Sequence, residues 1–188
     1  MSQCFSFFGF VVGQSDLGEQ DLLLSLLTKK RGKILVKAKG LRKITSKRLG
    51  VLQTGNLVKG QVHPKGDFFT LGEVELISSP IGLRKDLVGL GMVLTMSELI
   101  NRLLPEREEN QSVYHLYENT LRHLEKKVEV EEMLNFEIKL LDLLGYGLPE
   151  EIKRALKEKD LKLAQSCLWA YLTEISERKL VGLGKILA

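Results

Sequence analysis

The sequence predicts an α+β protein in which a small five-stranded β-barrel precedes an all-α region. Short runs rich in aromatic and β-branched residues, separated by compact turns, fill residues 1–79, whereas apolar residues recur at helical spacing through residues 80–188. The net charge changes at the same place, from +6 over residues 1–80 to −2 over residues 81–188. We therefore expect two domains that meet between residues 79 and 80.

Five strands are expected in the first part. A polar turn at Gln14 to Gly18 follows the first of them, and Pro64-Lys65-Gly66-Asp67 marks a hairpin between the last two. Because barrel closure removes exposed strand edges, these compact turns favour a barrel, although an open sheet covered by helices also agrees with the pattern. The expected strands span residues 5–13, 22–28, 33–39, 56–63 and 68–77.

The second part is expected to be helical throughout. Pro105 follows the first helix, and Gly145 ends the third, which is apolar over most of its circumference and is therefore expected at the centre of a bundle. Asp160 is a candidate N-cap for the last helix. The expected helices span residues 86–104, 112–127, 130–144, 149–157 and 161–175.

Composition excludes several classes of protein. The 188 residues are 44% hydrophobic and 28% charged, which is typical of a globular protein rather than a disordered one. Two cysteines, Cys4 and Cys167, are too few for a disulfide framework or a Cys-rich zinc site and favour a reducing compartment. No apolar run approaches the roughly 20 residues of a spanning helix, and the start lacks the basic region of a signal peptide. We expect a cytoplasmic protein without membrane association.

The strongest functional signal is a concentration of positive charge. Ten basic residues and no acidic residue lie between Lys29 and Arg48. Alternation along residues 33–39 places the apolar side chains inside a barrel and the lysines on its outer face, over roughly 20 Å. The stretch between Gly40 and Gly50 is expected to be a mobile basic loop that closes over a bound backbone. A merely solubilising surface is the alternative, but this charge density favours nucleic acid. The candidate binding residues are Lys29, Lys30, Arg31, Lys33, Lys37, Lys39, Arg42, Lys43, Lys47 and Arg48.

Aromatic side chains could add base stacking to this cationic surface, as they do in single-strand binders. Alternation separates Phe5 and Phe7 from Phe8 and Phe10, so one of these pairs is expected in the core. The pattern does not say which pair, and for any single residue core packing is the favoured role. The stacking candidates are Phe5, Phe7, Phe8, Phe10, Phe68 and Phe69.

The sequence shows no catalytic or metal-binding constellation. His115 and His123 are eight residues apart, which is roughly 12 Å along a helix and too far to share a metal. The glutamates of the helical part lack the inward Glu-x-x-His pattern of a di-metal bundle. The glycines near Lys185 lack the spacing of a P-loop. We expect no enzyme activity, no cofactor and no metal.

Six sequence motifs occur in the order in which one known family has them. They are an acidic turn with a Leu-rich strand, a T-x-x-x-G-K hairpin, an A-K-G-x-R segment followed by Ser and a basic residue, a glutamate-bearing last strand, a long helix ended by proline, and a central helix with a Leu-Gly-Tyr stop. They lie at residues 18–24, 27–33, 36–48, 73–76, 97–106 and 136–146. On these motifs, the chain resembles the recombination protein O (RecO) family of bacterial recombination mediators.

The resemblance implies an N-terminal oligonucleotide-binding (OB) barrel followed by an α-helical domain. It implies a nucleoid-associated protein that binds single- and double-stranded DNA and anneals complementary strands. It also implies that the protein acts with RecR to load RecA onto DNA covered by single-stranded DNA-binding protein (SSB). Members of the family bind the C-terminal tail of SSB, and none of these steps uses nucleotide hydrolysis. Because the A-K-G-x-R motif lies inside the basic stretch, Lys37, Lys39, Arg42 and Lys43 are expected to contribute most.

One departure from the family pattern is informative. Many members carry a four-cysteine zinc insertion after the Leu-Gly-Tyr helix, whereas here residues 145–149 lead directly into charged helical sequence with only Cys167 downstream. Zinc is therefore not implied. Two other function classes stay open: an adaptor whose helical part binds a protein while the basic face only solubilises it, and a small enzyme with an unrecognised site, which is the least favoured.

Overall fold

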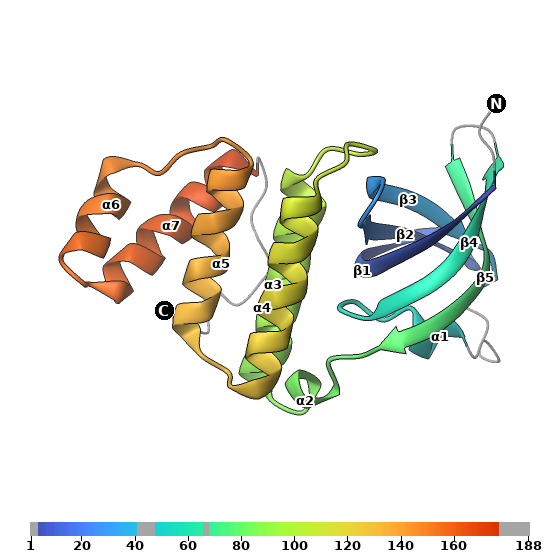
Figure 1. The fold of residues 1–188 in the computed structure, drawn as a ribbon, viewed down its shortest axis with the longest axis horizontal. Helices are drawn as coiled ribbons and strands as arrows, with labels where there is room; N and C mark the ends of the chain where they lie inside the picture. Colours follow the sequence, from blue (N-terminus) through green and yellow to red (C-terminus); the bar gives the residue numbers. More distant parts are fainter. Residues whose placement is uncertain (1–3, 41–47, 66–67, 177–188) are drawn as a thin grey trace. The chain divides into compact units, whose positions relative to one another are not determined.

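The computed structural model describes residues 4–40, 48–65 and 68–176. The chain forms two compact units (Figure 1). One consists of the residues up to Pro80 together with Leu104–Tyr114 and contains all five strands, and the other consists of Ile81–Leu103 and the residues from His115 onward. The strands are β1 (Phe5–Leu17), β2 (Asp21–Thr28), β3 (Gly32–Ala38), β4 (Leu57–Lys65) and β5 (Phe68–Ser78). The helices are α1 (Arg48–Val51), α2 (Ile81–Arg84), α3 (Leu87–Leu103), α4 (Gln111–Lys126), α5 (Val130–Leu143), α6 (Glu150–Lys157) and α7 (Leu161–Ile175). The division into an OB-fold domain over residues 1–79 and an α-helical domain over residues 80–188 stays a prediction.

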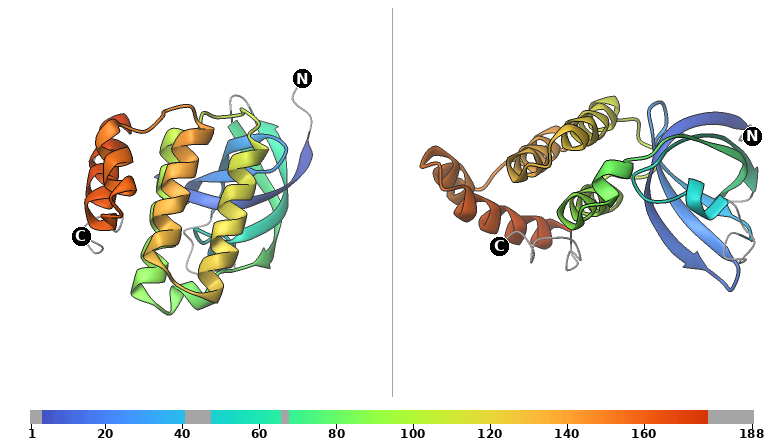
Figure 2. Two further views of the ribbon diagram at one scale, coloured as in Figure 1. Left: turned by 60° about the vertical axis from the view of Figure 1, so that its left-hand side comes forward. Right: turned by 90° about the horizontal axis from the view of Figure 1, so that it is seen from below.

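The five strands form a closed barrel in the order β1-β2-β3-β5-β4, in which β4 pairs with β1 (Figure 2). All neighbours are antiparallel except β3 and β5, which run parallel where Val36 lies beside Phe69 and Lys37 beside Thr70. A five-stranded barrel of this order is an OB fold. The predicted barrel is thus confirmed, and the open sheet is excluded.

The first strand is longer than the sequence pattern predicted. The polar segment at Gln14 to Gly18 was expected to be a turn, but β1 pairs with β2 as far as Leu17, which lies opposite Asp21. Its side chains from Gln14 to Leu17 are exposed, so the segment is polar because it faces water and not because it turns. The actual turn begins at Gly18, whose φ of 72° lies in the left-handed region that glycine tolerates.

The second unit is helical, as predicted. Tyr117 of α4 and Phe136 of α5 pack edge to face with ring centroids 6.4 Å apart, and the Tyr117 hydroxyl lies 2.6 Å from the Ser97 hydroxyl of α3. Helices α6 and α7 form a hairpin (Figure 1). The Asp160 side chain accepts the Leu163 N–H at 3.0 Å, which confirms the predicted N-cap of α7. Within the described ranges, no helix is long and apolar enough to cross a membrane.

Helix α5 carries a buried acid that its apolar pattern did not suggest. Glu137 is only 3% exposed, and burial raises its pKa to about 8. Because this pKa in the folded protein exceeds the ordinary value of 4.5, the folded state binds the proton more tightly than the unfolded state does. As far as Glu137 is concerned, the folded state is therefore most stable below about pH 4.5, where the side chain is protonated in both states. The free energy of unfolding falls as the pH rises from there toward about 8.

Replacing Glu137 with Gln removes this titration and should flatten the pH dependence of stability. We expect the free energy of unfolding of the variant to exceed that of the wild type increasingly between about pH 5 and 8, by up to about 1.4 kcal/mol per pH unit, and by a constant amount above that range. Urea unfolding at each pH measures the difference. Asp142→Asn changes an exposed acid of the same helix and serves as the control; parallel curves for wild type and Glu137→Gln would contradict the assignment.

Candidate nucleic-acid interface

Strand β3 presents lysines outward, as its alternation predicted. Ile34, Val36 and Ala38 are at most 1% exposed and belong to the barrel core. Lys37 and Lys39 lie on the opposite, outer face, where Lys37 is half-buried and Lys39 is exposed. The strand therefore separates an apolar interior from a cationic exterior, as a half-buried strand does.

Lys33 departs from this prediction because another segment of the chain covers it. The Arg107 N–H donates a 2.7 Å hydrogen bond to the Lys33 carbonyl, and Lys33 and Glu106 form an isolated parallel bridge. Lys33 is 7% exposed, and this burial lowers its pKa although nearby Glu106 acts in the opposite sense. The expectation that Lys33 shares the exposed outer face is therefore wrong.

An acidic neighbour compensates the charge of Lys37. Its ammonium lies 2.9 Å from the Asp21 carboxylate, whose other oxygen accepts the Gly40 N–H at 2.9 Å. The hydrogen bond from Lys37 is the main cause of the lowered pKa of Asp21, followed by that from Gly40. Asp21 thus holds Lys37 and the end of β3 in place and leaves Lys37 a weaker attractor of phosphate than Lys39.

Lys39 has a cationic neighbour that the sequence did not identify. Its pKa is lowered chiefly by the neighbouring ammonium group of Lys65, which disfavours a second positive charge close by. Lys65 is exposed at the end of β4. Lys65 lies outside the run of ten basic residues between Lys29 and Arg48, in a segment that the sequence predicted to be a hairpin turn. Only the barrel topology brings it close to β3.

The connection between β2 and β3 carries three exposed cations, Lys29, Lys30 and Arg31. The Thr28 hydroxyl organises this turn, since it donates to the Gly32 carbonyl at 2.8 Å and accepts the Arg31 N–H at 3.2 Å. These bonds give the T-x-x-x-G part of the hairpin motif a structural role. The turn presents its cations at one end of β3, and Lys39 stands beyond the other end.

Two arginines stack on aromatic rings beside this turn. The Arg31 guanidinium lies 3.9 Å from the centre of the Phe5 ring, which packs edge to face on Phe69 with centroids 5.2 Å apart. Arg107 lies over the second ring of the pair, 5.2 Å from the Phe69 ring centre. Arg107 was not among the predicted residues, because it lies far along the chain in the segment that covers Lys33. The cluster adds a further cation to this side of the barrel.

The remaining predicted cations lie elsewhere. Arg42, Lys43 and Lys47 fall outside the described residues, as does most of the loop that was expected to close over a backbone. Arg48 begins α1 and is exposed. The described interface therefore consists of the exposed cations Lys29, Lys30, Arg31, Lys39 and Lys65, and we call these residues the cationic face.

The structure sorts the aromatic candidates by exposure. Phe7 and Phe10 are about 5% exposed, one inside the barrel and the other against Tyr114, with ring centroids 5.4 Å apart. The core packing expected for single phenylalanines thus holds for these two. Phe8 and Phe68 are about half exposed, at 49% and 50%, so they are the rings that a ligand can reach over a large area.

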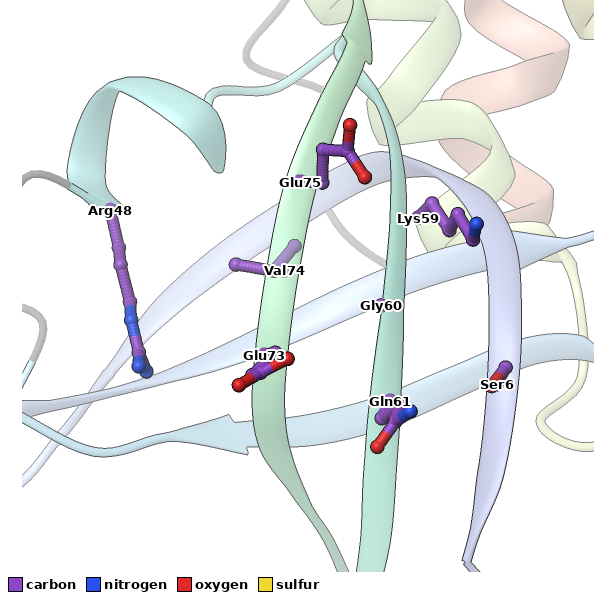
Figure 3. A pocket seen from close by; sticks show the side chains of 8 residues that line it. All are labelled: Ser6, Arg48, Lys59, Gly60, Gln61, Glu73, Val74 and Glu75. Carbon is purple, nitrogen blue, oxygen red and sulfur yellow. The ribbon is translucent and has the colours of Figure 1, made fainter.

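A groove of about 480 Å³ lies on another part of the barrel surface (Figure 3). It is lined by residues of β1, β4 and β5 and by Arg48, and its charges are mixed, because Glu73 and Glu75 line it together with Arg48 and Lys59. Carboxylates repel a phosphate backbone, so this groove is a poorer site for a polyanion than the cationic face. Across the described part of the chain, no three His, Cys, Asp or Glu side chains gather as metal ligands.

The closed five-stranded barrel and its strand order define the first part of this chain as an OB fold. Family models give the particular group. The model described as recombination protein O N terminal matches residues 1–80, and that described as recombination protein O C terminal matches residues 84–162. The chain belongs to the recombination protein O family, as its motifs predicted.

Curated relatives carry the name DNA repair protein RecO. That of Symbiobacterium thermophilum is 33% identical over 141 residues, which are 73% of this chain and 55% of that protein. That of Syntrophobacter fumaroxidans is 28% identical over 160 residues, or 85% of this chain and 64% of that protein. This chain therefore spans between about half and two thirds of the length of these relatives. The solved S. pombe Stn1-ten1 complex is 15% identical over 52% of this chain and 77% of its own, but its TM-score of 0.32 is too low to support an assignment.

Proposed function

We propose that this chain is a DNA-binding recombination mediator of DNA repair and not an enzyme. In this proposal, the cationic face binds single- and double-stranded DNA through the phosphate backbone. The observation that carries it is the exposure of five cations, four of them next to the ends of β3 and Lys65 at the end of β4, none of which forms an ion pair with another described residue. Family membership supports the same function. Arg42, which ends the A-K-G-x-R motif, and Lys43, which follows it, stay predicted contacts.

Annealing of complementary strands follows from the electrostatics of such a surface. Two DNA strands repel each other, and a protein that neutralises phosphates on one of them lowers the barrier to their encounter. We propose that RecR and the C-terminal tail of SSB bind the same protein, so that RecA is loaded indirectly. The near-neutral helical unit, which exposes apolar side chains such as Leu143, Tyr146 and Leu161, is the candidate for these protein partners.

A strand-annealing assay tests the proposal directly. Two complementary labelled oligonucleotides, bare or covered with SSB, should anneal faster when the protein is present. Binding to the single strand should weaken with salt at a log–log slope of about −3 to −4, as expected for roughly five phosphate contacts. An adaptor with a merely solubilising surface would shift no bare oligonucleotide at physiological salt and would not accelerate annealing, and this result would overturn the proposal.

A further inference from the structure

Phe68 occupies an unusual position for an aromatic side chain of this barrel. It opens β5 directly opposite Lys65 of β4, and its side chain is 50% exposed. The next residue, Phe69, packs against the barrel core. Because successive side chains of a strand point to opposite faces, Phe68 and Lys65 point to the same outer face, within reach of each other.

A pair of cations lies near this ring. Lys65 is the cross-strand neighbour of Phe68, and Lys39 stands close enough to Lys65 for their two charges to repel each other. No described carboxylate forms an ion pair with either lysine. Two adjacent ammonium groups repel each other, and a phosphate that contacts both removes this repulsion.

The other half-exposed ring has different surroundings. Phe8 lies beside Lys59, whose ammonium is 5.7 Å from the ring centre, and Lys59 faces Glu75 across β4 and β5. Glu75 and Glu73 belong to the groove of mixed charge (Figure 3). A nucleic-acid backbone would therefore meet carboxylates near Phe8 but ammonium groups near Phe68.

A phosphate-binding pair next to an exposed ring distinguishes single strands from duplexes. The flat face of an unpaired base can stack on an aromatic side chain, whereas the bases of a duplex stack on one another and offer no free face. Phosphate contacts alone do not make this distinction, since both forms of DNA carry them.

We propose that Phe68 is the stacking platform for one unpaired base whose neighbouring phosphate is held by Lys39 and Lys65, and that this ring makes the cationic face selective for single strands over duplex. The inference rests on the proposed DNA-binding function and adds a specificity-determining residue to it.

The test compares Phe68→Ala with Phe8→Ala, which removes an equally exposed ring from the same barrel. Fluorescence anisotropy measures binding of an oligothymidine of about 20 nucleotides and of a duplex of equal length. We expect Phe68→Ala to weaken single-strand binding about 5-fold or more and to change duplex binding less than about 2-fold. Phe8→Ala should change neither, and Phe68→Trp should retain single-strand affinity because indole also stacks.

A single strand that carries abasic sites in place of its bases provides the sharpest control. On this ligand, the wild type and Phe68→Ala should bind equally, since only the phosphates are left to contact. An equal loss on all three ligands would assign a structural role to Phe68 and overturn the inference, as would unchanged single-strand affinity. If the wild type binds neither DNA form, the proposed function itself fails, and this outcome is distinct from a failure of Phe68 alone.

Discussion

Reversing four charges of the cationic face should nearly abolish DNA binding. The variant carries Lys29→Glu, Lys30→Glu, Lys39→Glu and Lys65→Glu, all at exposed positions. On counterion-release reasoning, each single-strand phosphate contact contributes about 4-fold in affinity at 0.15 M salt, so four lost contacts weaken binding on the order of 200-fold. The log–log salt slope should become shallower by about 3. Anisotropy titrations over a range of salt concentrations measure both quantities.

A control with the same net charge separates a local surface from a general electrostatic effect. Lys85→Glu, Lys126→Glu, Lys157→Glu and Lys162→Glu change four exposed lysines outside the barrel. Each Lys→Glu change replaces one positive with one negative charge and so lowers the net charge by two, which takes both variants from +4 to −4. We expect the control to keep affinity within about 3-fold. If both variants lost affinity equally, or if neither did, the cationic face would not be the DNA site.

Much of this surface could be predicted because the signals are local. The two-residue period of β3 predicted which side chains enter the barrel, and Ile34, Val36 and Ala38 are inside it. The turn of three cations also follows from local sequence, since Thr28 caps it through bonds that span four residues or fewer. Short-range periodicity and turn chemistry act within a few residues and can be read from one sequence.

The rest could not be predicted because it depends on contacts between distant residues. Lys33 has the same local pattern as Lys37, yet it is buried by Glu106 and Arg107, more than seventy positions along the chain. Lys65 joins the interface only because β5 lies between β3 and β4 in the barrel. Alternation likewise separated Phe7 from Phe8 but could not say which faced the core, since either register obeys the same period.

The segment that buries Lys33 also explains a glycine of the hairpin motif, and replacing that glycine should destabilise the barrel strongly. Gly32 has a φ of 62°, and a Cβ atom at this position would lie 1.8 Å from the backbone oxygen of Glu108. The left-handed conformation alone costs an alanine about 1–2 kcal/mol. The clash is with backbone and cannot be relieved by turning a side chain, so residues 106–108 must move away from β3 and the Arg107 hydrogen bond to Lys33 must break.

Two further glycines divide this effect into its parts. Gly18 has a φ of 72°, but no atom lies within 4 Å of the place that a Cβ would occupy. Gly18→Ala therefore costs only the free energy of the left-handed backbone conformation, without a steric clash. Gly50 lies in helical α1 with no atom near its virtual Cβ, and Gly50→Ala should leave stability unchanged or raise it slightly. In urea unfolding, we expect Gly32→Ala to lose about 3 kcal/mol or more and Gly18→Ala about 1 kcal/mol. The difference between them measures how firmly residues 106–108 are held on β3, and equal losses would mean that this segment contributes nothing to the stability of the barrel.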